Sequence, residues 1–163
     1  MKKEITILSK VLTKNKLTLS IAESLTGGAL SASLVSLPGA TAYFKGGIIA
    51  YDNSIKTSLL NVSIKTLTTH GAVSSQCAKE MVRGVKKLLS TNTAIAVTGI
   101  AGPSGGTTIK PVGLVYAGFI IKNRLKIKEY HFKGSRDKII RETVRAVLRD
   151  ATSLIRVSVN NRK

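Results

Sequence analysis

Short apolar runs alternate with amphipathic patterns through the first two-thirds of the chain, and this alternation constrains the fold more than any other feature. The runs at 18–22, 48–51 and 94–98 predict strands, and the last is small and apolar enough to be buried on both faces. Apolar residues at helical spacing fill the stretches between them. The spacing predicts helices over 4–14, from 29 to about 37, in a short segment containing Lys56, from Ser63 to His70, and over 74–89.

The final third of the chain has a different pattern. An apolar strand is predicted over 113–121, followed by a turn at 122–124 and a second strand over 125–132. Lysines alternate with apolar residues in that second strand, which is typical of a half-exposed edge strand protected from further pairing. A helix is predicted over about 136–156, and residues 157–163 are expected to form a frayed tail.

Together these elements predict a three-layer α/β/α sandwich with a mixed sheet, a C-terminal β-hairpin and a final helix. No repeat or linker divides the 163 residues, so we expect one domain over 1–163 with a core over about 5–156. The single cysteine, Cys77, excludes an internal disulfide and a multi-cysteine metal site, and its helical pattern predicts a buried thiol. No apolar run approaches the ~20 residues that cross a bilayer, and no signal peptide is evident, so a cytoplasmic protein is expected.

The charge balance is strongly basic. Lysine and arginine number 26 against 8 acidic residues, which gives a formal net charge of +18 and invites a nucleic-acid interpretation. However, the basic residues are scattered from Lys2 to Lys163, and 3 Phe, 4 Tyr and no Trp leave few stacking platforms among them. The sequence therefore favours attraction of a small anionic substrate over sequence-specific nucleic-acid binding.

Residues 18–28 place Ser24 at a turn between a strand and a helix. Thr26 is the expected N-cap of that helix, and Gly27 and Gly28 follow it. A turn of this kind exposes a hydroxyl beside free backbone N–H groups, which suits a nucleophile or an anion. Alternatively, Ser24 or Thr26 only caps the helix.

Two further polar residues, Tyr51 and Thr98, also lie at the ends of predicted strands. If these strands are parallel to the one before Ser24, all three side chains lie at one edge of the sheet. Alternatively, Tyr51 is an ordinary strand-end tyrosine. Otherwise its hydroxyl orients or relays a proton near Ser24, and the Thr98 hydroxyl points into the same cleft.

A serine nucleophile needs a base, and the histidines are poor candidates. Histidine occurs only at 70 and 131, neither near a convincing acid partner, so a Ser-His-Asp triad and a histidine metal site are poorly supported. Lys56 is the best remaining candidate, in the first turn of a helix that Asp52 or Asn53 can cap. The positive end of the helix dipole disfavours a cation there.

Proton abstraction requires neutral Lys56. An ordinary lysine, with a pKa of about 10.4, is neutral in only about one molecule in 2,500 at pH 7. Burial and nearby cations lower a lysine pKa, whereas pairing with Glu23 or Asp52 would prevent this. Alternatively, Lys56 is an exposed helix lysine with no chemical role.

The loop from Gly99 to Gly106 is flexible enough to turn backbone N–H groups toward an anion. It lacks the terminal Lys-Ser/Thr of a nucleoside-triphosphate P-loop, and the chain has no G-x-G-x-x-G fingerprint. Arg136, at the start of the last predicted helix, can contribute a charge-assisted contact to phosphate. Alternatively, Arg136 is a solvated surface residue.

Several of these segments, taken in order, resemble the C-terminal domain family of competence-damage-inducible protein A. The resemblance covers about residues 5–156 and is carried most clearly by Ile-Ala-Glu-Ser-Leu-Thr-Gly-Gly at 21–28 and Ala-Val-Thr-Gly-Ile-Ala-Gly-Pro-Ser-Gly-Gly-Thr at 96–107. The other matching segments are 38–40, 44–47, 50–51, 56–57, 59–60, 70–74 and 110–113.

Stand-alone members of this family include nicotinamide-nucleotide amidases. The resemblance implies hydrolysis of nicotinamide mononucleotide to nicotinate mononucleotide and ammonia, in a homodimer, without metal or cofactor. It implies that Ser24 is the nucleophile, Lys56 the general base and Tyr51 its hydrogen-bonding partner. The resemblance assigns substrate binding to Thr98 and the glycine loop after it. With the candidates from the residue analysis, the expected substrate-binding residues are Thr26, Gly27, Gly28, Gly46, Thr98, Gly99, Gly102, Gly105, Gly106 and Arg136.

Two features depart from the family pattern, namely Gly134-Ser135 before Arg136, where an acidic residue is common, and the strongly basic composition. Two other functions remain open at this stage. One is a nucleotide-binding module of the same family with weak or no turnover. The other, less favoured, is a basic accessory protein for nucleic acid.

Overall fold

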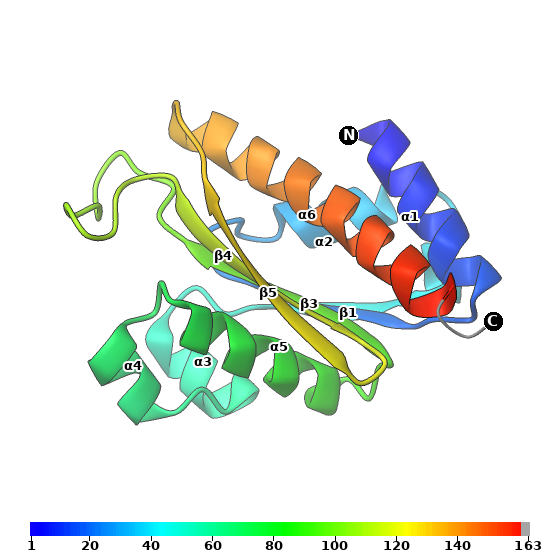
Figure 1. The fold of residues 1–163 in the computed structure, drawn as a ribbon, viewed down its shortest axis with the longest axis horizontal. Helices are drawn as coiled ribbons and strands as arrows, with labels where there is room; N and C mark the ends of the chain where they lie inside the picture. The colour runs from blue at the N-terminus through cyan, green and yellow to red at the C-terminus, as the bar shows by residue number, and fades with distance from the viewer. Residues whose placement is uncertain (161–163) are drawn as a thin grey trace.

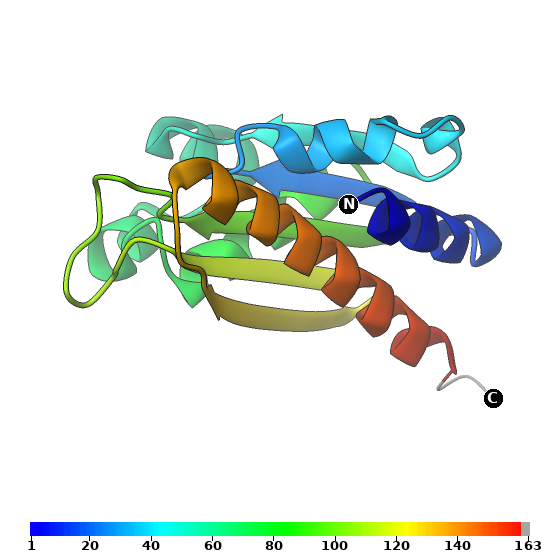
Figure 2. The same ribbon diagram turned by 90° about the horizontal axis from the view of Figure 1, so that it is seen from above.

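A computed structural model describes residues 1–160, which form a five-stranded sheet with helices on both faces (Figures 1 and 2). The strand order is β2-β1-β3-β4-β5. β1 pairs in parallel with β2 and with β3, whereas β3–β4 and β4–β5 are antiparallel. The strands are β1 (Leu19–Glu23), β2 (Phe44–Ile49), β3 (Thr93–Gly99), β4 (Leu114–Ile121) and β5 (Arg124–His131).

Three helices cover each face of the sheet, so the predicted three-layer sandwich with a mixed sheet is confirmed (Figure 1). On one face lie α1 (Lys2–Lys14), α2 (Ala29–Val35) and α6 (Arg136–Asn160); a short 3-10 helix, η1 (Ala40–Ala42), precedes β2. On the other lie α3 (Asn53–Leu60), α4 (Ile64–His70) and α5 (Ser75–Leu88). None of the described helices has the length and apolar content needed to cross a bilayer.

Side-chain alternation along the strands divides the core into two clusters. Ile21, Ile95 and Val97 face the layer of α1, α2 and α6, while Ala22 and Ala96 face the layer of α3 and α5. The small side chains on the second face leave room for α5 to lie close to the central strands. The same alternation decides toward which face of the sheet each side chain at the strand ends points.

Close packing of α5 against α3 fixes the helix that carries Lys56. A Cβ at Gly84 would lie 2.0 Å from the Leu60 carbonyl oxygen, so only glycine permits this contact. Asp52 is the N-cap of α3, and its side chain accepts from the Ser54 N–H. Of the two predicted caps, Asp52 and Asn53, the structure selects the first. Ser63, where the sequence predicts the next helix to begin, is the N-cap of α4, and its hydroxyl accepts from the Thr66 N–H.

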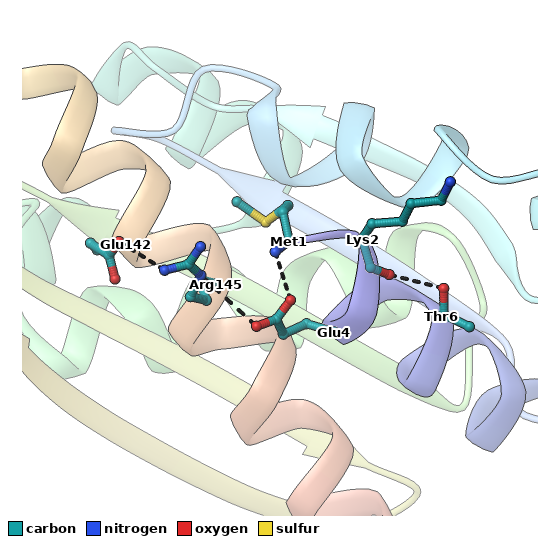
Figure 3. A network of polar contacts seen from close by, with 6 residues as sticks. All are labelled: Met1, Lys2, Glu4, Thr6, Glu142 and Arg145. Atoms are coloured by element: carbon teal, nitrogen blue, oxygen red, sulfur yellow. Dashed lines mark hydrogen bonds and ion pairs between the residues drawn. The ribbon is translucent and has the colours of Figure 1, made fainter.

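A polar network attaches the start of α1 to α6 (Figure 3). The Glu4 carboxylate lies 2.7 Å from the Met1 amino group and 3.9 Å from Arg145 Nε, and Arg145 also contacts Glu142 at 3.3 Å. Because these groups are partly exposed, the pairs orient the helices more than they stabilise them. The buried apolar residues between α1 and α6 supply the main stabilisation.

Several predicted boundaries are wrong by a few residues. The strand predicted over 48–51 begins earlier, at Phe44, and ends at Ile49, because pairing with β1 extends through the two glycines of β2. α2 ends at Val35 rather than near 37. Residues 157–160 continue α6 instead of fraying, since Ser158 is buried; residues 161–163 lie outside the described part of the chain.

Candidate active site

A pocket of about 230 Å³ lies at the carboxyl ends of β1, β2 and β3. It brings together six of the predicted residues: Ser24, Tyr51, Lys56, Thr98, Gly99 and Arg136. Because these three strands are parallel, their ends meet at one edge of the sheet as expected. Larger hollows lie elsewhere on residues 1–160, and the linings of four of these combine no buried lysine with an uncommitted hydroxyl.

Ser24 is the first residue after β1, and its backbone N–H still donates to the Val97 carbonyl at 3.0 Å. By strand alternation its side chain belongs to the same face as Ala22, the face covered by α3 and α5. Ser24 is 9% exposed, and within residues 1–160 its hydroxyl has no hydrogen-bond partner. The hydroxyl is therefore not committed to a structural contact.

Glu23, one residue earlier, belongs to the opposite face and is fully buried. Its carboxylate accepts from the backbone N–H groups of Gly28 (3.1 Å), Leu30 (3.0 Å) and Ser31 (2.8 Å). These donors at the start of α2 satisfy the buried charge. Glu23 is thus tied to α2 and is not paired with Lys56.

This arrangement corrects two predictions about the turn. Thr26 is not the N-cap: Gly28 occupies the cap position with a φ of 102°, and Thr26 Oγ1 is buried without a partner among the described residues. The N–H groups of Gly27 and Gly28 are not free, because Gly27 donates to the Ser24 carbonyl and Gly28 to Glu23. The structure leaves two other N–H groups of the turn, those of Leu25 and Thr26, without an acceptor within residues 1–160.

Lys56 is 1% exposed, and its Nζ donates to the Tyr51 carbonyl at 2.9 Å. No carboxylate of the described residues forms an ion pair with it. Desolvation lowers the pKa of Lys56, opposed by the electrostatic influence of Cys77 and Asp52. Lys56 therefore meets the two conditions set by the sequence argument: it is shielded from solvent, and it forms no ion pair with Glu23 or Asp52.

The two groups that oppose this shift lie on α5 and at the start of α3. Cys77 is fully buried, and burial raises the pKa of its thiol to about 11, so it is neutral at physiological pH. The Asp52 carboxylate is committed to Ser54, whose hydroxyl lies 2.6 Å away, and this contact lowers the pKa of Asp52. Asp52 stays charged but is directed to the helix N-terminus rather than to Lys56.

Tyr51 contacts the site differently from the prediction. Its carbonyl holds Lys56, but its side chain is 60% exposed, and its hydroxyl accepts from Arg136 Nη2 at 3.1 Å. A proton relay from Ser24 through the Tyr51 hydroxyl is therefore not supported. Arg136 also donates from Nη1 to the Gly102 carbonyl at 2.9 Å, so it joins the start of α6 to two strand-end loops.

The remaining predicted residues divide between the pocket and its surroundings. Thr98 is buried at the pocket wall, and its hydroxyl donates to the Ala72 carbonyl at 2.8 Å, which fixes the α4–α5 connection beside the site. Gly46 is misplaced by the prediction: it pairs with Ser20, well before the strand ends. The other residues outside the pocket lining are Thr26, Gly27, Gly28, Gly102, Gly105 and Gly106.

The histidines do not join the pocket. His131 does have an acidic partner, contrary to the prediction, since its Nε2 lies 2.7 Å from Glu129 Oε1, but both side chains are exposed on β5. His70 ends α4 and lies outside the pocket lining. Within residues 1–160 no group of three histidine, cysteine or acidic side chains is arranged to hold a metal ion.

Sequence reasoning missed several residues of the pocket wall. Asn53 begins α3, and Ala72 and Val73 form the α4–α5 connection. The sequence indicates Asn53 only as an alternative cap, although its place directly after Asp52 is a signal for a second polar group at the strand end. Ala72 and Val73 lie in segment 70–74, one of the stretches that carry the family resemblance, but their apolar side chains give no chemical signal of a role in the site. They reach the pocket because Thr98 on β3 binds the α4–α5 connection.

The fold and the pocket define a three-layer α/β protein with a buried lysine and an uncommitted serine at the strand ends. A family model described as the CinA C-terminal domain matches residues 2–155. The chain belongs to this family. It is 50% identical over 133 residues, 82% of its length, to a CinA-like protein of Dictyoglomus thermophilum. It spans about a third of the length of the curated relatives that it matches, 32% in this case.

Solved structures agree with this assignment. A CinA superfamily protein from Klebsiella pneumoniae has a TM-score of 0.92 and 28% identity, covering 94% of this chain and 96% of that one. The competence/damage inducible protein CihA from Agrobacterium tumefaciens has a TM-score of 0.90 and 36% identity, with 94% of each chain covered.

Proposed function

We propose that the protein is a nicotinamide-nucleotide amidohydrolase that converts nicotinamide mononucleotide to nicotinate mononucleotide and ammonia by a Ser–Lys mechanism. The class of reaction is supported by the pocket, and the choice of substrate rests on the family resemblance. The observation that carries the proposal is the burial of Lys56 without a carboxylate, in the same pocket as the Ser24 hydroxyl.

Burial supplies what a lysine base needs. Since desolvation lowers the pKa of Lys56, the neutral amine is more populated at physiological pH than in an exposed lysine. The Tyr51 carbonyl accepts one N–H and thereby restrains Nζ, while the amine lone pair remains available for a proton. Nζ is not hydrogen-bonded to Ser24 in the structure of residues 1–160, and such contacts commonly tighten only when substrate binds.

The proposed reaction has two halves. Neutral Lys56 accepts the Ser24 proton as Oγ attacks the carboxamide carbon of the nicotinamide ring, and protonated Lys56 then donates to the leaving ammonia. In the second half, Lys56 takes a proton from water as the water oxygen attacks the ester carbonyl, and protonated Lys56 returns it to Ser24 Oγ as the acyl–oxygen bond breaks. The released acid loses its proton to solvent and leaves as the nicotinate carboxylate. The N–H groups of Leu25 and Thr26 are the oxyanion donors we propose, because those of Gly27 and Gly28 are already engaged.

The substrate phosphate is assigned to the side of the pocket that Arg136 occupies. The guanidinium is exposed and forms no ion pair within the described residues, so it can exchange its contact with the Tyr51 hydroxyl for one with phosphate. Ligand pockets commonly measure ~300–1,000 Å³. The pocket here measures about 230 Å³, so it encloses the pyridine end of the nucleotide while the phosphate extends past Arg136.

Ammonia release from nicotinamide mononucleotide tests the proposal directly. We expect turnover by the unmodified protein, loss of at least ~10³-fold in Ser24→Ala, and no loss in the control Ser36→Ala, an exposed residue at the end of α2. Arg136→Gln should raise KM by about tenfold with a smaller change in kcat. Equal activity of the unmodified protein and Ser24→Ala would refute the nucleophile.

A binding module without turnover is the second candidate, and the bond from Lys56 Nζ to the Tyr51 carbonyl favours it. If Lys56 stays a protonated ammonium bound to the Tyr51 carbonyl with substrate present, it cannot accept the Ser24 proton. Calorimetric binding of the mononucleotide without ammonia release would select this candidate.

The resemblance also implies a homodimer, and we expect sedimentation to give twice the chain mass.

A further inference from the structure

A groove lined by basic side chains lies at the opposite end of the sheet from the pocket that holds Ser24 and Lys56. α5 ends at Leu88, and the β4–β5 turn lies beside the start of β3, where Thr93 pairs with Ile121. A groove of about 540 Å³ runs between that helix end and that turn. At about 3.3 Å per residue, the seven-residue β3 separates the groove from the pocket by about 20 Å.

Four cationic side chains line this groove, which we call the basic groove. Arg83, Lys86 and Lys87 come from α5, and Lys122 comes from the β4–β5 turn. None of the four takes part in an ion pair formed by the described residues. Glu80, the acidic residue of α5, is engaged with Ser63 and Thr66 at the start of α4.

The helix dipole of α5 explains only part of the positive charge in the basic groove. Lys86 and Lys87 lie in the last turn of α5, where cations interact favourably with the helix dipole. That explanation does not extend to Arg83, one turn earlier, or to Lys122 on the turn across the groove. Folding therefore gathers, from two segments about 35 residues apart in the sequence, cations that no acidic neighbour neutralises.

We propose that the basic groove binds the phosphate backbone of nucleic acid without regard to sequence. A chain of phosphates matches four cations spread over two walls better than a single small anion does, and the net charge of +18 attracts any polyanion to the surface. No aromatic side chain lines the groove, so bases have no stacking platform. Ser90 and Asn123 add neutral hydrogen-bonding groups at the rim.

The basic groove changes the interpretation of the strongly basic composition. Scattered basic residues and few aromatics argued against sequence-specific recognition, and the groove agrees with that point. What the sequence concealed is that four of the scattered cations share one surface. The inference does not depend on the amidohydrolase assignment, since the groove and the pocket lie at opposite ends of β3.

Fluorescence anisotropy with a labelled 20-nucleotide single strand tests the proposal. Four phosphate contacts predict a slope of about −3 for log affinity against log salt, or about a 50-fold loss between 50 and 200 mM KCl. The variant Arg83→Gln/Lys86→Gln/Lys87→Gln should bind more weakly, with a slope near −1. The control Lys2→Gln/Lys3→Gln/Lys10→Gln removes the same charge from exposed positions on α1 and should keep a slope near −3.

Three outcomes would overturn the proposal. They are the absence of binding at 50 mM KCl, an equal change in slope for both triple variants, and displacement of the strand by polyglutamate as effectively as by unlabelled DNA of equal charge. Mixed-sequence and oligothymidine strands should bind within about threefold of each other; a larger preference would show base recognition and would overturn the proposal as well. Circular dichroism confirms that each variant is folded.

Discussion

Two ionisable side chains near Ser24, Glu23 and Lys56, are buried on opposite faces of the sheet. The two sides differ in how far hydrogen bonds compensate the buried charge. On the α2 side, Glu23 is fully buried and receives three backbone N–H donors. On the α3 side, Lys56 is equally buried and makes one hydrogen bond, to the Tyr51 carbonyl. The first charge is fully compensated, and the second is not.

This difference separates a structural charge from one suited to chemistry. A compensated carboxylate stays ionised and fixes the turn that presents Ser24. An under-compensated ammonium has its pKa lowered by desolvation, so the neutral base becomes accessible. Buried Lys56 lowers the free energy of unfolding, whereas buried Glu23 raises it. Substitutions at the two residues should therefore change the stability of the protein in opposite directions.

The largest expected effect is on catalysis at Lys56. Lys56→Met keeps the length and burial of the side chain but removes the base, so kcat should fall about 10²–10⁴-fold. Ammonia release from nicotinamide mononucleotide measures this. Lys65→Met, at an exposed position on α4, is the matched control and should retain full activity. Equal activity of the two variants would remove Lys56 from the mechanism.

The next effect is on stability at Glu23. Glu23→Gln leaves α2 with buried N–H donors that a single amide oxygen cannot satisfy, so the free energy of unfolding should fall by about 2–3 kcal/mol. Urea denaturation measures this loss. Glu80→Gln is a suitable comparison because Glu80 accepts from only two donors and is only half-buried, so its loss should be smaller. A smaller loss at Glu23 than at Glu80 would contradict the comparison.

Lys56→Met should raise stability near neutral pH by about 0.5–2 kcal/mol. In the unfolded chain the Lys56 pKa returns to about 10.4, whereas burial lowers it in the folded protein. The unfolded chain therefore binds more protons between the two values, and the stability of the unmodified protein rises with pH across that window. Urea denaturation at several pH values should show the gain disappearing above about pH 11. A gain that is independent of pH would point to packing instead.

The smallest effect concerns the field of Asp52. This carboxylate raises the Lys56 pKa slightly against desolvation, so Asp52→Asn should lower that pKa further while the amide keeps the helix cap. The acidic limb of the kcat/KM profile should therefore move slightly to lower pH. Glu142→Gln, on the surface of α6, should not move it. A shift to higher pH would contradict the assignment of the limb to Lys56.

The order of helices and strands could be predicted because it depends on local periodicity. Side-chain spacing alone marked the α5 helix and the buried β3, and candidate cap residues located the starts of α3 and α4. The β1–α2 turn was mispredicted at Thr26 because the capping group, Glu23, lies five residues before Gly28. Local cap rules consider a side chain next to the helix start, not one reaching across from a strand.

The sequence by itself determined the layered α/β class and the placing of Ser24, Tyr51 and Thr98 at strand ends, since both follow from hydrophobic period and chain order. Only the tertiary structure decided that Glu23 binds α2, that Lys56 is buried without a counter-ion, and that Arg136 holds the Tyr51 hydroxyl. The physical reason is that the pKa of a side chain depends on what surrounds it in space. Burial and partners come from elements that are distant in the chain, and periodicity carries no record of them.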